Sequence, residues 1–149
     1  MAISGTHVML AVDLFKAGNH GSTYGGTPLA CRASLAVIQL LQEGAIDNAA
    51  VMGERMIQGF KTAFADLDVE VNGRGLMIGL RLAKPCAELV AQARDEEKLL
   101  INVTADSVIR LLPALNISAE EADEIVNRVS RLVKRFLTNI KLPLAEICS

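Results

Sequence analysis

The sequence predicts an α+β fold, in which helices pack on an antiparallel-rich sheet. Apolar residues recur with a helical period of about 3.6 along residues 28–67 and again along residues 118–136. Between these regions the period shortens to two in several short runs, which is typical of half-buried strands. The element order is therefore two helices followed by β-β-α-β-β-α, an order typical of helices packed on one sheet.

Two long helices are predicted first. One runs from Pro28, a residue suited to the first helical turn, to about Gly44. The other runs from Ile46 to about Leu67, where polar residues end it. The apolar positions are Leu29, Ala33, Ala36, Val37, Leu40 and Leu41 in the first helix, and Ala49, Ala50, Met52, Met56, Phe60 and Phe64 in the second.

A hairpin or sharp bend is predicted after the second helix. Val69 and Val71 alternate with polar residues and lead into a turn-forming segment, Asn-Gly-Arg-Gly at residues 72–75. Apolar residues then alternate along residues 76–82, which predicts a half-buried strand. The glycines on either side of Arg74 favour turn geometry, so Arg74 is assigned no catalytic role.

A third helix and two more strands are expected next. Pro85 begins the helix, and residues 99–103 and 107–112 form the strands, joined by a short polar turn at residues 104–106. The residues of the helix that are expected to face inward are Leu89, Val90 and Ala93.

The C-terminal helix has the clearest start signal. Ser118 and Glu121 form a capping-box pattern, in which each side chain bonds the other residue's backbone N–H. The buried stripe is expected to comprise Ala122, Ile125, Val129, Leu132 and Phe136. Four basic residues of its C-terminal half are interpreted as a solvated face: Arg128, Arg131, Lys134 and Arg135.

Composition restricts the class of protein and its location. The 149 residues are 51% hydrophobic but only 3% aromatic, so aliphatic side chains must fill the core. A net charge of −2 and the lack of a basic stripe predict no nucleic-acid partner. Residues 1–14 do not resemble a signal peptide and are too short to span a membrane, so no membrane partner is expected. Three widely spaced cysteines without a CxxC pair indicate a reducing compartment, and we expect a cytoplasmic protein.

Residues 20–26, His-Gly-Ser-Thr-Tyr-Gly-Gly, combine hydroxyls and glycines just before a predicted helix. Backbone N–H groups and the positive end of the helix attract an anion, and Ser22 and Thr23 can donate hydrogen bonds to phosphate oxygens. The segment therefore predicts a phosphate site; the alternative is that Thr23 only caps a turn. His7 and His20 lack the carboxylate spacing of a metal site, so no metal is expected.

Arg110 lies inside an apolar run and is the second candidate site residue. A buried arginine is costly unless it has a partner, and its planar fork matches a carboxylate with two parallel hydrogen bonds. Arg110 therefore suggests carboxylate recognition. The alternative is an arginine at the edge of the sheet that faces water or pairs with a nearby acid.

Three segments carry a resemblance to a known family. They are His-Gly-Ser-Thr-Tyr-Gly-Gly-Thr-Pro-Leu-Ala-Cys at residues 20–31, Gly-Arg-Gly-Leu-Met-Ile-Gly at residues 73–79, and Val-Ile-Arg-Leu-Leu-Pro-Ala-Leu-Asn-Ile at residues 108–117. In this order they resemble the C-terminal part of class III aminotransferases, in particular the acetylornithine and ornithine aminotransferase group. The similarity extends from about Phe15 to about Phe136, and Thr27 departs from the asparagine that is more usual there.

The resemblance implies the C-terminal small domain of a fold-type I pyridoxal phosphate enzyme, preceded by long connecting helices. It predicts a remnant of the large domain with the phosphate-binding loop (residues 1–27), the connecting helices (residues 28–67) and the α+β C-terminal domain (residues 68–149). In the family, the threonine of the first motif contacts the phosphate of pyridoxal phosphate bound in the neighbouring subunit of a homodimer.

That threonine corresponds to Thr23, with Ser22 beside it, and the arginine of the third motif corresponds to Arg110. The resemblance therefore implies that Ser22 and Thr23 bind the cofactor phosphate. It also implies that Arg110 binds the α-carboxylate of the substrate.

The implied reaction is transfer of an amino group from the δ-position of an ornithine derivative to 2-oxoglutarate, as in arginine biosynthesis. The implied partners are a second copy or a missing large domain, and the substrates are amino acids and 2-oxo acids. In the family, the Schiff-base lysine lies farther upstream of the first motif than the nineteen residues that precede His20. No catalytic residue is therefore assigned, and the 149 residues alone are expected to be inactive.

Two other interpretations stay open. In the first, the chain is a non-catalytic α+β relic or a dimerisation or regulatory module that keeps the fold without the reaction. Alternatively, a separate polypeptide supplies the large domain and the two complement each other. Whether DNA upstream of Met1 encodes the lysine segment in frame would discriminate among these interpretations. The choice among acetylornithine, ornithine and succinyl-diaminopimelate depends partly on residues outside the chain.

Overall fold

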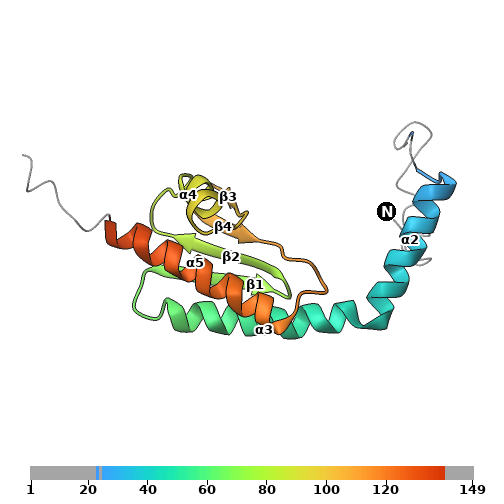
Figure 1. Ribbon diagram of the computed structural model, residues 1–149, viewed down its shortest axis with the longest axis horizontal. Helices are drawn as coiled ribbons and strands as arrows, with labels where there is room; N and C mark the ends of the chain where they lie inside the picture. Colours follow the sequence, from blue (N-terminus) through green and yellow to red (C-terminus); the bar gives the residue numbers. More distant parts are fainter. Residues whose placement is uncertain (1–22, 24, 140–149) are drawn as a thin grey trace, which may run out of the picture. The chain divides into compact units, whose positions relative to one another are not determined.

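The structure, a computed structural model, describes residue 23 and residues 25–139 (Figure 1). The chain divides into two compact units between Gly44 and Ala45. The predicted division into three parts at residues 27 and 67 stays a prediction. The two units are described separately below.

The first unit contains helix α2 (Pro28–Leu40). Thr27 caps it, because its side-chain oxygen accepts a hydrogen bond of 3.4 Å from the backbone N–H of Ala30. The helix continues into a π-helical turn, η1 (Leu41–Ala45), in which Gly44 has a φ of 121°. Such a φ interrupts a right-handed helix and suits glycine, so the predicted end near Gly44 is confirmed.

Helix α3 (Ile46–Ala63) begins the second unit and buries Gly53, Met56, Ile57 and Phe60. The helix is shorter than predicted. It ends at Ala63 because Phe64 leaves helical geometry, with φ −111° and ψ 17°. Phe64 is nevertheless buried, so the end of the helix keeps its apolar contact with the core.

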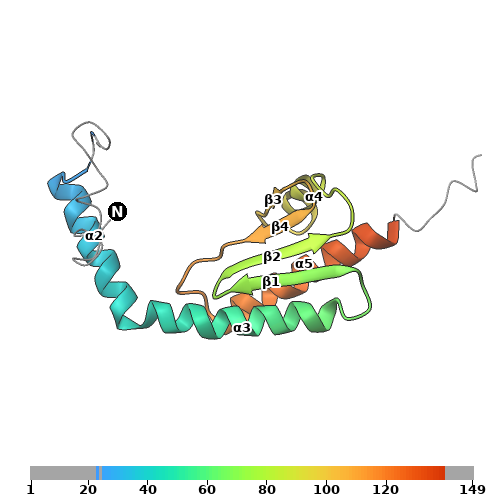
Figure 2. The same cartoon turned by 180° about the vertical axis from the view of Figure 1, so that it is seen from behind.

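Four antiparallel strands form one sheet in the order β1-β2-β4-β3 (Figures 1 and 2). The strands are β1 (Val69–Arg74), β2 (Met77–Leu82), β3 (Asn102–Thr104) and β4 (Val108–Leu111). A two-residue turn joins β1 to β2, and its first residue, Gly75, has a φ of +54°. The predicted hairpin and the α+β class are both confirmed.

Helix α4 (Leu89–Glu96) differs from its prediction in two respects. It begins at Leu89 rather than at Pro85, because the preceding segment is held elsewhere: the Cys86 N–H donates a 2.8 Å hydrogen bond to the Asp106 carbonyl. The prediction that Val90 faces inward is wrong, since Val90 is 40% exposed. Leu89 and Ala93 are buried as expected.

Helix α5 (Ala119–Asn139) begins with the predicted capping box. The Ser118 N–H donates to Glu121 Oε2 at 2.9 Å, and the Glu121 N–H donates to Ser118 Oγ at 3.2 Å. The predicted stripe is buried except for Ile125, which is only partly buried. Val133 and Ser130 are buried in addition.

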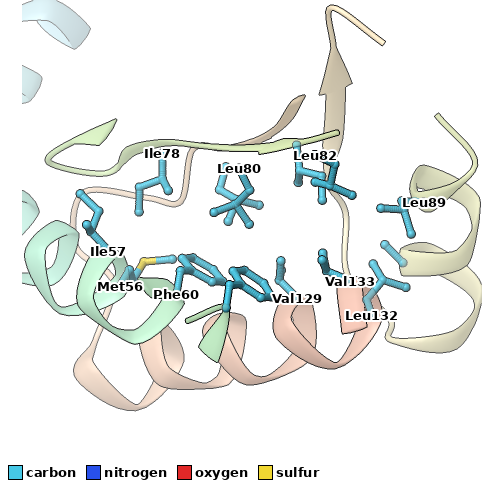
Figure 3. Packing of buried hydrophobic residues seen from close by; sticks show 14 of the residues in the cluster. Met56, Ile57, Phe60, Ile78, Leu80, Leu82, Leu89, Val129, Leu132 and Val133 are labelled. Atoms are coloured by element: carbon cyan, nitrogen blue, oxygen red, sulfur yellow. The ribbon is translucent and has the colours of Figure 1, made fainter. Parts of the chain in front are cut away.

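The core lies between one face of the sheet and the helices α3 and α5 (Figure 3). Side chains of β2 alternate as predicted, and Ile78, Leu80 and Leu82 point from the sheet toward Phe60 and Val129 of the helices. The residues of β2 that alternate with these apolar ones therefore lie on the opposite face of the sheet. Arg110 lies on that opposite face as well.

Apolar side chains of α2 remain exposed in the described part of the chain, and no residue of this helix is buried. One 18-residue window of the helical stretch Pro28–Ala63 has a mean hydropathy of 1.2, so the stretch is long and apolar enough to cross a membrane by length and composition alone. Its second half, α3, carries the buried residues that pack on the sheet.

Candidate functional site

Thr23 is exposed, two residues before a turn at Gly25 and Gly26 that leads into α2. Gly26 has a φ of +77°, which favours glycine, and Thr27 then caps the helix. The first turn of α2 contains no acidic residue, so nothing in it offsets the positive end of the helix. Ser22, the other predicted phosphate ligand, lies outside the described residues.

Arg110 belongs to β4, which lies between β2 and β3 in the sheet. Its neighbours Ile109 and Leu111 are buried in the core, so strand alternation places Arg110 on the opposite, exposed face. The alternative was wrong to place Arg110 at the sheet edge, but the side chain is exposed, as that alternative also expected. Among the residues that the structure describes, none makes a hydrogen bond or ion pair with the guanidinium of Arg110, whose backbone pairs with both neighbouring strands.

A hollow of about 330 Å³ opens where β3 and β4 diverge, and of the described residues that line it only Arg110 is charged. Asn102 lines the same hollow and pairs with Arg110 across the two strands. Leu100 and Leu112 contribute exposed apolar side chains, with 86% and 57% exposure. An unpaired guanidinium with apolar surface beside it suits a carboxylate that carries an aliphatic chain.

The loop after β4 is held to helix α3 by one side chain. The amide nitrogen of Asn48 donates hydrogen bonds of 2.7 Å to the Leu115 carbonyl and 3.1 Å to the Ile117 carbonyl. Two otherwise unbonded loop carbonyls are thereby satisfied, and the loop that borders the Arg110 hollow at Pro113 is fixed to a rigid helix.

Lysines and metal-binding groups are the other side chains that can act in catalysis. The lysines in the described part of the chain are exposed; they are Lys61, Lys84, Lys98 and Lys134. Within the same residues, no group of three or more histidine, cysteine or acidic side chains is placed to hold a metal ion.

Glu97 is the one buried charged residue of the described chain, with 6% exposure. Arg131 Nη2 and Arg135 Nη2 donate to its carboxylate at 2.7 Å and 2.9 Å, and Arg128 Nη1 donates to its backbone carbonyl at 2.6 Å. The hydrogen bond from Arg131 is the main cause that lowers the pKa of Glu97 below its ordinary value. Arg131 and Arg135 are exposed, as the interpretation of a solvated face predicted, and together with Arg128 they also join α5 to the end of α4.

Replacing Glu97 by glutamine is expected to lower the free energy of unfolding by about 1.5–3 kcal/mol at pH 7, the usual range for hydrogen bonds to charged groups. Because the folded-state pKa of Glu97 is lowered, its contribution is present above the ordinary value of 4.5 and is lost as the pH falls through the folded-state value. Urea unfolding at pH 7 and at lower pH should show the two proteins converging under acidic conditions.

The control for this prediction is Glu96→Gln. Glu96 pairs with the same Arg135 at 2.9 Å, but its side chain is 49% exposed, so little change is expected. An equal loss of stability in both variants, or a Glu97→Gln difference that does not depend on pH, would contradict the assignment.

The fold and these binding groups agree with one family of transaminases. The profile of the aminotransferase class-III family matches residues 2–133, and the chain belongs to this family. Class III aminotransferases depend on pyridoxal phosphate. The predicted resemblance to this family is thus confirmed.

Within the family, the chain is similar to acetylornithine and ornithine aminotransferases, among others. The acetylornithine aminotransferase of Nitrosomonas europaea is 46% identical over 131 residues, which are 85% of this chain and 33% of the relative. The structure of Plasmodium falciparum ornithine delta-aminotransferase matches with a TM-score of 0.75 and 30% identity, over 86% of this chain and 34% of that one.

A third match is the acetylornithine aminotransferase of Elizabethkingia anophelis, with a TM-score of 0.72, 29% identity and coverage of 84% of this chain and 33% of that chain. The chain thus spans about a third of the length of the relatives that it matches.

The roles of Ser22, Thr23 and Arg110 stay predictions. Thr23 belongs to the first compact unit and Arg110 to the second. Sequence reasoning missed Asn102, although the short turn at residues 105–107 contains the signal: pairing Thr104 with Val108 places Asn102 opposite Arg110. It also missed the burial of Glu97, for which the sequence around that residue carries no signal.

Proposed function

We propose that this chain forms the C-terminal part of a pyridoxal phosphate-dependent acetylornithine- or ornithine-type aminotransferase, which transfers an amino group to 2-oxoglutarate in arginine biosynthesis. The observation that carries the proposal is the unpaired Arg110 in a hollow with apolar walls, in a chain 46% identical to an acetylornithine aminotransferase. Arg110 binds the α-carboxylate of the amino acid or 2-oxo acid and orients it by two parallel hydrogen bonds.

The donor groups before α2 fit the phosphate of the cofactor. Thr23 has an exposed hydroxyl, and the capped N-terminus of α2 follows it without an acidic residue in its first turn. Thr23, together with Ser22, would hold the phosphate through these hydroxyls. When bound, pyridoxal phosphate supplies the electron sink for the reaction.

The proposal includes the partners and the location. The exposed apolar side chains of α2 fit a covering surface, supplied by a second copy of the chain or by the remaining two thirds of the family fold. We propose no membrane or nucleic-acid partner and a cytoplasmic location, because α3 of the apolar stretch packs on the sheet and the net charge is −2. The 149 residues alone are proposed to be inactive.

A chimera tests the function directly. The matched region of this chain replaces the corresponding last third of the Nitrosomonas europaea acetylornithine aminotransferase, and glutamate formation from N-acetylornithine and 2-oxoglutarate is measured. We expect an active chimera. Arg110→Ala should lower its kcat/KM by roughly 10²–10⁴-fold, because two charge-assisted hydrogen bonds of about 1.5–3 kcal/mol each are lost.

Two controls accompany the chimera. Arg81→Ala removes another exposed arginine of the same sheet, one that pairs with Glu70 at 3.4 Å, and should leave kcat/KM nearly unchanged. The 149-residue chain alone, treated with pyridoxal phosphate and borohydride, should give no stoichiometric adduct on a single lysine. A chimera that binds the cofactor but does not transaminate, or tolerates Arg110→Ala, would refute the proposal.

A further inference from the structure

Arg110 is part of a row of four residues that crosses the whole sheet. Asn72 of β1 pairs with Gly79 of β2, Gly79 pairs with Arg110 of β4, and Arg110 pairs with Asn102 of β3. Residues paired in this way lie on the same face, with Cβ atoms about 4.5–5.5 Å apart between neighbouring strands. Arg110 therefore has an asparagine on one side and a glycine on the other.

Asn102 is a second hydrogen-bond donor beside Arg110. It is exposed and lines the same hollow, and no hydrogen bond joins its side-chain amide to another of the described residues. The amide group can donate two hydrogen bonds through its nitrogen, without adding charge. A carboxylate has more acceptor positions than one guanidinium fork fills, so an amide beside the fork can bind the same group.

Gly79 keeps the other side of Arg110 open. A Cβ atom added to it would meet only Val108 Cγ1 at 3.5 Å and the Asn72 carbonyl oxygen at 3.9 Å, which are ordinary contacts. Its φ is not in the left-handed region, so neither packing nor backbone geometry requires a glycine there. A glycine inside a strand nevertheless lowers stability, and such residues often mark places where a ligand approaches.

We propose that Asn102 and Gly79 determine how Arg110 receives its carboxylate ligand. Asn102 donates a hydrogen bond to the carboxylate, and the missing side chain at Gly79 leaves the space through which the ligand reaches the guanidinium. The aliphatic part of the ligand then packs on Leu100 and Leu112, which line the same hollow. This inference rests on the proposed function, because it takes Arg110 to be the carboxylate-binding residue.

The test is a titration of the ¹⁵N-labelled 149-residue chain with 2-oxoglutarate, followed by NMR at the side-chain nitrogens of Asn102 and Arg110. Asn102→Ala is expected to raise Kd about 3–10-fold, the effect of one hydrogen bond. Gly79→Val should weaken binding by a similar or larger factor without lowering the melting temperature, because valine favours strands. Asn72→Ala is the matched control, since it changes the same row two strands away from Arg110 and should leave Kd unchanged.

Arg110→Ala separates this inference from the proposed function. If Arg110→Ala abolishes binding while Asn102→Ala and Gly79→Val bind like the unaltered chain, the inference fails and the role of Arg110 stands. If Arg110→Ala binds normally, the carboxylate role of Arg110 fails as well. An unaltered chain whose Asn102 and Arg110 signals do not move with 2-oxoglutarate also overturns the inference, and the chimera then decides the function.

Discussion

Phe60→Ala is expected to lower the free energy of unfolding of the second unit by about 3–5 kcal/mol, the usual cost of removing a buried aromatic ring. Phe60 is completely buried, and its ring stacks on that of Phe64 with centroids 6.0 Å apart and planes 6° from parallel. Figure 3 shows it between the strand β2 and helix α5. Because small domains are stable by about 5–15 kcal/mol in total, this single change removes a large part of the stability.

Urea unfolding followed by circular dichroism measures this effect as a lower midpoint with an unchanged slope. Lys61→Ala is the matched control, because Lys61 is the next residue of α3 but is exposed, and it should change stability by less than about 0.5 kcal/mol. Equal midpoints for the two variants would mean that α3 does not pack on the sheet through Phe60.

Local patterns were sufficient to predict the order of the elements. The alternation of Ile78, Leu80 and Leu82 and the capping box at Ser118 depend only on neighbouring residues, and both are confirmed. The start of α4 was predicted wrongly, because it depends on a contact between residues that are distant in the sequence. The segment before it is bonded to the carbonyl of Asp106, 20 residues further along the chain, and no local pattern contains that contact.

The same distinction applies to the candidate site. Some of its residues could be identified from their neighbours in the sequence, whereas another depends on contacts with distant residues. Ser22, Thr23 and Arg110 were selected because each lies in a short motif that can be read in the sequence. The burial of Glu97 depends on Arg131 and Arg135 of a helix that starts more than 20 residues later, so its own neighbourhood gave no signal. Asn102 lies between these cases, because strand pairing from the turn places it beside Arg110.

Gly53→Ala is expected to destabilise the second unit by about 3 kcal/mol, near the upper end of the usual range for overpacking. A Cβ atom on Gly53 would lie 2.2 Å from the carbonyl oxygen and 2.3 Å from the carbonyl carbon of Gly75. These are backbone atoms, so no side-chain rotation can relieve the overlap. The hairpin turn that contains Gly75 would have to move away from α3, together with the strands that it joins.

Gly59→Ala on the same helix provides the comparison. Its Cβ would meet Val126 Cγ1 at 3.0 Å, and this contact is with the end of a side chain that can adjust. Both changes gain roughly 1 kcal/mol of helix propensity, because alanine replaces glycine in each. The difference between their unfolding midpoints therefore measures the destabilisation that comes from the backbone contact. A Gly53→Ala protein as stable as Gly59→Ala would show that the hairpin and α3 do not approach this closely. The expected large difference would instead establish that Gly53 fixes the hairpin, and with it the strand β2 that pairs with β4 and Arg110.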